Sequence, residues 1–278
     1  GEQGEEQSAG EPQRGLAQGA RGKVAGGRSA LSQNYVRSTA EGKYQEVVTR
    51  ASKLNAALQV AKSDWNALTA TVQKIEDDLK AAVDLANADV GDDTIELGGL
   101  TAVLDRCHDE EEPGPYDEDG NVDGDLDAND ATGALIVRNG VVEQRCEHRI
   151  LDGNTATVLT VHGVTITGGY VFRPGGGIAS AGPVVVEDSL VTGNESEAAG
   201  GGIAAPDVVV RRSSITDNVT TDILGGGGGA GIRATRSVRL VDSVVSDNTV
   251  VFAGQGGGVR APTVTVRRST ITHNDTGY

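Results

Sequence analysis

The chain has 278 residues, of which 37% are hydrophobic but only 3% aromatic, with 40 glycines and no methionine. A conventional globular core of this length uses more large side chains, so the composition favours thin stacked layers of Val, Ile, Leu and Ala. The formal net charge of −16 argues against nucleic acid as a partner, because its phosphates require basic patches. No apolar run reaches the length that crosses a bilayer.

Residues 1–35 are rich in Gly, Glu, Gln and Arg and offer almost no apolar surface to bury. This composition predicts a disordered N-terminal arm.

Residues 36–90 predict a long α-helix, because no Pro or Gly interrupts residues 43–90 and Gly91 follows as a C-terminal signal. Apolar residues follow one another in alternating steps of four and three, which makes an unbroken heptad seam. The seam consists of Val47, Ala51, Leu54, Leu58, Ala61, Trp65, Leu68, Val72, Ile75, Leu79, Ala82 and Ala86. Two interpretations stay open: a coiled-coil stalk that oligomerises, or an amphipathic helix folded back onto its own domain.

Residues 92–158 combine two predicted strands, "DDTIEL" and "ALIVRNGVVE", with an acidic loop at 107–130 between them. Within that loop, "DGNVDGDLDAND" has the spacing of an EF-hand calcium loop, with Gly124 at the sixth position. The liganding positions are Asp119, Asn121, Asp123, Asp127 and Asp130. Pro113 and Pro115 argue against the helix that precedes an EF-hand loop. A calcium site and a merely acidic surface loop are therefore both retained.

The two cysteines, Cys107 and Cys146, flank most of this loop, and each has a histidine close by. Within each pair, Cys107 with His108 and Cys146 with His148, the two residues are too close together for the usual zinc-chelating loops, which have two to four intervening residues. An even count permits one disulfide. A Cys107–Cys146 disulfide is favoured over free thiols, and zinc is the least favoured.

After Leu151 a phrase recurs: "VVVEDSLVTGN", "VVVRRSSITDN", "VRLVDSVVSDN" and "VTVRRSTITHN". Glycine-rich segments between the phrases end at Ile178, Ile203, Ile232 and Val259, so the repeats are 25, 29 and 27 residues long. Such a period predicts a parallel solenoid with one coil per repeat and these four side chains stacked inside. Glycine allows the sharp bends and the close approach of stacked backbones.

Two further columns of the repeat predict structural ladders. Asn194, Asn218, Asn248 and Asn274 share one position and predict amide hydrogen bonds from coil to coil. The residue before the repeated serine alternates in charge, as Asp188, Arg212, Asp242 and Arg268. This alternation predicts an exposed ion-pair ladder that fixes the register of the coils.

The repeat resembles the right-handed parallel β-helix proteins of the polymorphic outer-membrane-protein-repeat type, within the broader pectin-lyase-like group. Upstream, "LKAAVDLANADVGDDTIEL" and "GDLDANDATGALIVRN" are similar to the helical cap and first coils of bacterial extracellular members, so the resemblance covers about residues 78–278. It implies a mainly β chain: a parallel β-helix over 91–278, preceded by the helix and the arm. It also implies an extracellular or cell-surface location.

Asp217, Asp247 and His273 precede ladder asparagines on consecutive repeats and are similar to the carboxylate clusters of β-helix enzymes that cleave polysaccharides. The same residue types also suit turns. The repeat region has only four aromatic residues, which are too few for a wall that stacks on sugar rings: Tyr170, Phe172, Phe252 and Tyr278. A structural or adhesive role is therefore favoured over a polysaccharide-active enzyme or glycan-binding module. The expected partners are a cell-surface or glycan ligand and further copies of the chain. Copies would associate through the helix seam or through the solenoid end, where the sequence stops in mid-repeat at Tyr278. No cofactor other than calcium is expected.

Overall fold

The computed structural model describes residues 30–88, 91–105, 126–128, 133–153, 158–221, 227–252 and 255–277, with side chains from residue 41 onward. The chain divides into two compact units between Ser63 and Asp64. In the first unit the described residues form helix only. The second unit contains the rest of that helix and all the strands of the described residues. Most of the predicted N-terminal arm lies outside the described residues.

Helix α1 (Ala30–Ala88) confirms the predicted long helix, with a start six residues earlier and an end two residues earlier than expected. Exposed ion pairs one turn apart support it, such as Arg50 with Glu46 at 2.7 Å and Lys74 with Asp78 at 2.6 Å. Among the described residues, no helix has the length and apolarity needed to cross a membrane.

The heptad seam of α1 has two different environments. Its C-terminal part packs on the solenoid core, since Leu79 and Ala86 are each 3% exposed and Ile75 and Ala82 are partly buried. The predicted helix that folds back onto its own domain is thus confirmed for this part. By contrast, the seam residues Val47, Leu54, Leu58, Trp65 and Leu68 are all 59–71% exposed.

The strands form one 16-stranded and one 5-stranded sheet, and the pairs within them are parallel. The early strands are β1 (Asp93–Glu96), β2 (Thr101–Leu104), β3 (Leu126–Asp127), β4 (Ala134–Gln144), β5 (Leu151–Gly153), β6 (Val158–Thr167) and β7 (Tyr170–Val171). The middle strands are β8 (Ile178–Ser180), β9 (Val184–Glu187), β10 (Leu190–Thr192), β11 (Glu195–Ser196), β12 (Ile203–Arg211), β13 (Ser214–Thr216) and β14 (Val219–Thr220). The last strands are β15 (Ile232–Val241), β16 (Val244–Ser246), β17 (Thr249–Val250), β18 (Val259–Arg260), β19 (Thr263–Arg267), β20 (Thr270–Thr272) and β21 (Asp275–Thr276).

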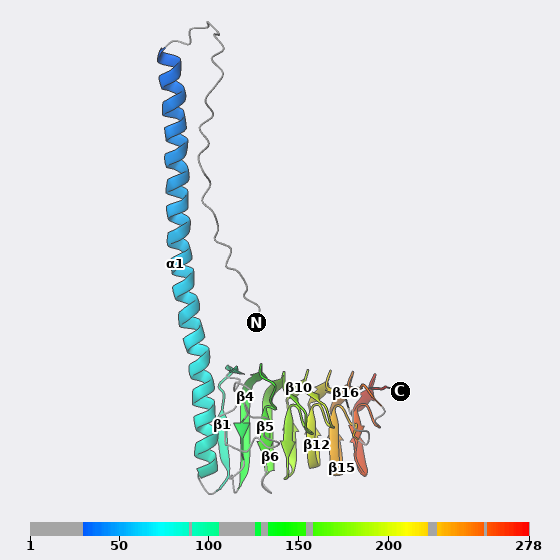
Figure 1. Cartoon of the computed structure of the whole chain (residues 1–278). Coiled ribbons are helices and arrows are strands. Elements are labelled where there is room, and N and C mark those ends of the chain that lie inside the picture. Colours follow the sequence, from blue (N-terminus) through cyan, green and yellow to red (C-terminus); the bar gives the residue numbers. More distant parts are fainter. Residues whose placement is uncertain are drawn as a thin grey trace, which may run out of the picture. The chain divides into compact units, whose positions relative to one another are not determined.

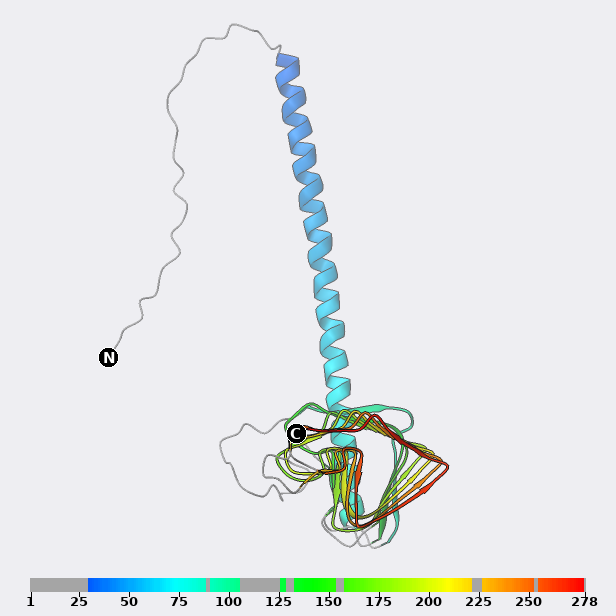
Figure 2. The same ribbon diagram turned by 90° about the vertical axis from the view of Figure 1, so that its right-hand side faces the viewer.

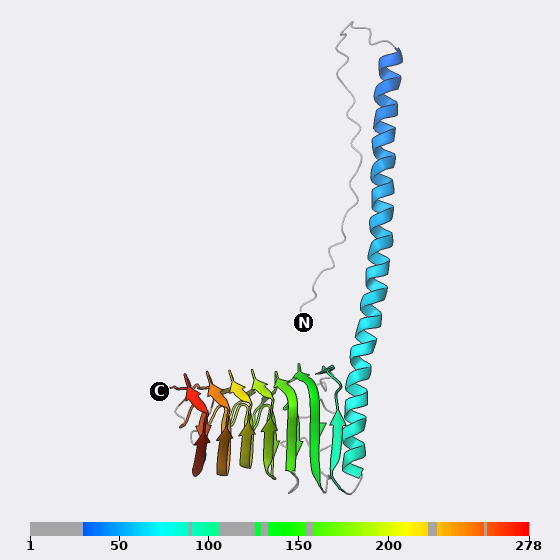
Figure 3. The ribbon, with the colours of Figure 1, turned by 180° about the vertical axis from the view of Figure 1, so that it is seen from behind.

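The repeats stack as the coils of a parallel β-solenoid, which confirms the predicted fold class (Figures 1 and 3). Seen along their axis, successive coils superpose (Figure 2). The predicted inner column is also confirmed: Ile178 pairs with Ile203, Ile203 with Ile232, and Ile232 with Val259. The three isoleucines are fully buried, and Val259 packs partly buried against the core.

The first coils depart from the sequence prediction in two places. The predicted strands at "DDTIEL" and "ALIVRNGVVE" are confirmed as β1 and β4, which pair in parallel. The short strand β2 was not predicted, and it pairs with the second half of β4. Strand β3 lies inside the segment predicted as an irregular acidic loop; it pairs with β5, and its Leu126 is buried among the solenoid's apolar residues.

The glycine-rich segments are required by close backbone approach between coils. A Cβ atom added to Gly201 would lie 2.1 Å from the carbonyl oxygen of Val219. Its neighbour Gly200 has φ +63, in the left-handed region where side chains are disfavoured. These glycines bring the bend of one coil into direct backbone contact with the next, as the sequence predicted.

Candidate functional site

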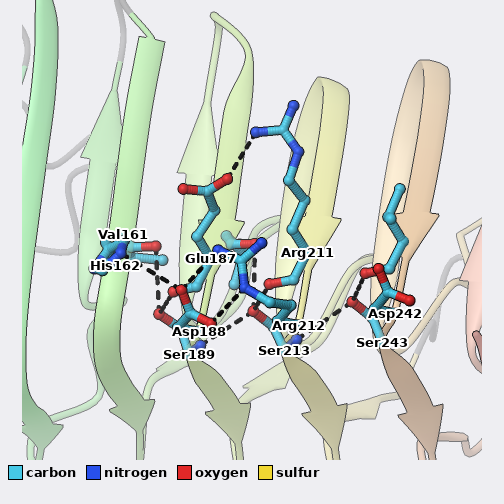
Figure 4. Close-up of polar contacts among 12 residues, drawn as sticks. Val161, His162, Glu187, Asp188, Ser189, Arg211, Arg212, Ser213, Asp242 and Ser243 are labelled. Carbon is cyan, nitrogen blue, oxygen red and sulfur yellow. Dashed lines mark hydrogen bonds and ion pairs between the residues drawn. The ribbon is translucent and has the colours of Figure 1, made fainter.

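Each coil turns a corner after its long strand, and a buried serine ladder lines that corner (Figure 4). The Ser189 backbone N–H donates to the Ser213 Oγ at 3.1 Å, and the Ser213 N–H donates to the Ser243 Oγ at 3.3 Å. Each of these hydroxyls donates in turn to a carbonyl two residues earlier, at 2.6–2.7 Å. The serines thus satisfy backbone groups that the turn would otherwise leave buried without a partner.

The residues that precede the serines form two separate exposed ion pairs, so the predicted ladder is confirmed at its first and last steps only. Arg212 binds Asp188 through two hydrogen bonds of 2.7 and 2.8 Å, and Arg268 binds Asp242 in the same way at 2.5 and 2.6 Å. These hydrogen bonds hold the pKa of both carboxyls below its usual range. All four residues have φ of +48 to +51, a left-handed conformation that the sequence did not predict for them.

The second corner holds the predicted asparagine ladder. The side-chain amide of Asn194 donates to the Oδ1 of Asn218 at 3.0 Å, and that of Asn218 donates to the Oδ1 of Asn248 at 2.9 Å. The last step, from Asn248 to Asn274, measures 2.8 Å. The first three asparagines are completely buried, so their amides act inside the protein and are closed to ligands.

The catalytic candidates Asp217, Asp247 and His273 lie at this second corner on consecutive coils, and all three are exposed. Their φ angles are +55, +59 and +52. In the two coils before Asp217, the same position is held by Gly168 and Gly193, which also have positive φ. Asp is among the residues that tolerate this conformation best, so the turn by itself accounts for both aspartates. A catalytic role for the three residues stays a prediction.

Of the five predicted calcium ligands, only Asp127 belongs to the described residues. It lies in strand β3, opposite Asp152, with 2% of its surface exposed. Its carbonyl oxygen accepts a hydrogen bond of 2.7 Å from the Asn87 side chain of α1. Asp119, Asn121, Asp123 and Asp130 lie outside the described residues, so the calcium site stays a prediction.

Cys146 is buried and disulfide-bonded. Cys107, the second cysteine of the sequence, lies outside the described residues. A disulfide at Cys146 agrees with the favoured interpretation of the cysteines and leaves no thiolate there for zinc.

A groove of about 330 Å³ lies on the solenoid where strands β5, β8, β12 and β15 run side by side. Its position follows from one outward column: Asp152 pairs with Ala179, Ala179 with Ala204, and Ala204 with Arg233. Five of the lining residues are alanines, whose small side chains leave the groove open: Ala179, Ala181, Ala199, Ala204 and Ala205.

The charged residues of the groove come from different coils. Arg149 binds Asp152 at 2.8 Å, and the two side chains are only 11% and 13% exposed. Arg233 lines the groove three coils further along. An apolar alanine surface with a fixed ion pair and a second arginine suits a small polar ligand that also has an apolar face. None of the catalytic candidates and no aromatic residue lines this groove.

The serine ladder and the groove were both missed at the level of sequence. The serine ladder has a clear signal, since Ser189, Ser213, Ser243 and Ser269 recur in the repeat as regularly as the asparagines. The groove has a weaker sequence signal, because its position depends on which short side chains from different repeats become neighbours in the stack.

The chain matches no protein-family model, and neither the curated proteins nor the solved structures contain a match to it.

Proposed function

We propose that the chain is an extracellular structural or adhesive protein of the polymorphic outer-membrane-protein-repeat type, whose solenoid presents a binding surface. The observation that carries this proposal is how the chain uses the polar residues that recur at the same position of successive repeats. The serines and asparagines bond coil to coil inside the protein, and the aspartates and arginines pair with each other outside it. A repeat that uses its polar residues in this way builds a scaffold.

Two further observations support an extracellular scaffold. The disulfide at Cys146 fits an oxidising compartment. The net charge of −16 keeps a long solenoid soluble and discourages non-specific association. The groove that contains Arg149, Asp152 and Arg233 is a concave part of the described surface that can hold a ligand.

A polysaccharide-active enzyme of pectin-lyase-like shape is the alternative function. The observation in its favour is the succession of Asp217, Asp247 and His273 on neighbouring coils, which places acid and base groups along one exposed edge. Two groups of this kind can protonate a glycosidic oxygen and activate a water molecule.

One set of variants separates the two functions. Binding of the purified chain to an array of neutral and acidic oligosaccharides would be compared with that of Ala204→Phe, which fills the groove. Val209→Phe is the matched control, because Val209 lies further along the same strand β12 and does not line the groove.

A scaffold that binds through the groove loses binding in Ala204→Phe, keeps it in Val209→Phe and leaves every oligosaccharide intact. Release of new sugar ends by the parent chain, abolished by Asp217→Asn together with Asp247→Asn, would reject the scaffold in favour of the enzyme. Equal binding by Ala204→Phe and Val209→Phe would show that the groove is not the binding surface.

A further inference from the structure

The seam of helix α1 changes from exposed to buried along its length. From Ile75 onward it packs against the solenoid, whereas Val47, Leu54, Leu58 and Trp65 are 63–71% exposed. An exposed apolar stripe of this length on a helix is unusual for a soluble protein and marks an interaction surface. Its strict alternation of three and four residues is the period of a coiled coil, which identifies another helix as the occupant.

We infer that this exposed part of the seam, from Tyr44 to Leu68, pairs with the same segment of a second copy of the chain in antiparallel orientation. The direction follows first from what is already covered. A parallel pair in register would align the two seams along their whole length, yet from Ile75 to Ala86 the seam is occupied by the chain's own solenoid. An antiparallel pair centred on residue 56 uses the exposed segment alone.

The volumes of the side chains support the same register. In a pair centred on residue 56, the numbers of two seam residues that face each other add up to 112. The large Trp65 then faces the smaller Val47, and Leu54 faces Leu58. The remaining layers are Ala51 with Ala61 and Tyr44 with Leu68. In a parallel pair, Trp65 would face Trp65 in the middle of the interface, which is harder to pack.

Charge selects the antiparallel register as well. Arg50 and Asp64 both immediately precede seam positions, which places them at the edges of the pair. In antiparallel coiled coils, such edge residues lie beside their equivalents on the partner helix, so Arg50 of each copy comes beside Asp64 of the other. In a parallel pair, Arg50 and Asp64 face Asn55 and Thr69 of the partner helix, so no ion pair forms between the two helices. Antiparallel registers one heptad to either side also lose the ion pair, because they place Arg50 beside Ala57 or Thr71.

The first test measures association of the full chain by sedimentation equilibrium. We expect a dimer whose dissociation constant rises about a hundredfold or more in the double variant Leu54→Glu with Leu58→Glu, because four leucines leave the interface. Val60→Glu is the matched control: Val60 is 61% exposed on the same helix but lies off the seam, so the dimer persists. A monomeric parent chain, or a dimer unaffected by the double variant, would overturn the inference.

The second test determines direction by disulfide cross-linking on a non-reducing gel. A mixture of Ala51→Cys and Ala61→Cys chains is expected to cross-link between the two variants, whereas Ala51→Cys alone is expected to give no more dimer than the parent. Cross-linking by Ala51→Cys alone would show a parallel pair and refute the antiparallel register. Charge reversal adds a separate readout: Arg50→Glu and Asp64→Arg each weaken the dimer, and the two together restore it. The inference does not depend on what the solenoid binds.

Discussion

The asparagine ladder offers the sharpest test of how the coils hold together, through the variant Asn218→Ala. Asn218 is completely buried and makes five side-chain hydrogen bonds. Its Oδ1 accepts from the backbone N–H of Asn194 at 3.2 Å and from the Asn194 side chain at 3.0 Å. Its amide donates to Val191 and Thr216 carbonyls at 3.0 and 2.8 Å, and to the next asparagine at 2.9 Å.

The magnitude follows from which groups lose every partner. In Asn218→Ala the side chain of Asn194 keeps its bonds to the Ile166 and Thr192 carbonyls, but the backbone N–H of Asn194 is left buried with no other acceptor. One such group costs about 1–3 kcal/mol, and the space vacated by the amide adds to it. We expect a loss of about 3 kcal/mol. At Asn274 water can reach the site because this last asparagine is only partly buried, so Asn274→Ala loses about 1 kcal/mol.

Urea unfolding followed by circular dichroism measures both variants against the parent. The variant Asn218→Asp adds a check on mechanism. Its carboxylate would face the two carbonyls and the Asn248 oxygen that now accept from the amide. Burial and these acceptors raise the pKa of the new carboxyl in the folded state, so the variant is less destabilised at about pH 4 than at about pH 7. Equal losses from Asn218→Ala and Asn274→Ala would refute the reasoning.

Three further predictions concern the glycine bends, the hydrogen bond between Tyr170 and Glu197, and the acidic loop. Gly201→Ala is expected to lose about 3 kcal/mol in urea unfolding because of its clash with the Val219 backbone. Gly42→Ala, with open space around it in α1, should gain about 0.5–1 kcal/mol, and a similar loss in both would contradict the packing argument. The hydrogen bond of 2.6 Å to Glu197 raises the pKa of Tyr170 to about 12. The stability it contributes is present below the ordinary tyrosine pKa of about 10 and is lost as pH rises through about 12, so Tyr170→Phe is less stable than the parent at about pH 8 and the gap closes toward pH 12. If the acidic loop binds calcium, millimolar calcium raises the melting temperature and Asp123→Ala abolishes the rise; an unchanged melting curve would leave only the acidic surface loop.

The features that the sequence predicted well depend on its periodicity. The four stacked positions from Ile178 to Val259, the asparagine ladder and the alternating ion pairs all recur at one position of every repeat. In a parallel stack, a position in the repeat translates directly into a column in space. The heptad seam likewise predicted α1, because a period of 3.5 residues is specific to a helix.

The features that it missed depend on irregular positions. Strand β2 is only four residues long, and β3 is two residues long within an acidic segment, so neither shows a period, and only the family resemblance at "GDLD" implied β3. The left-handed conformation of Arg212 and Arg268 contradicts the intrinsic preference of arginine and becomes evident only once the corner is built. The groove arises because the outward column changes from Asp152 through two alanines to Arg233, which is a difference between repeats and not a property of any one of them.

The two internal ladders also bear on how such a chain can change in length over evolution. From Ser189 onward, successive serines and successive asparagines are 24 to 30 residues apart, and each of these coils offers the same donors and acceptors to the next. Duplication or loss of one whole repeat would therefore rejoin both ladders without creating a new interface. Arg233, which lines the groove, belongs to a single coil. Lineages can thus lengthen or shorten this rod in whole coils while its outward-facing chemistry diverges separately.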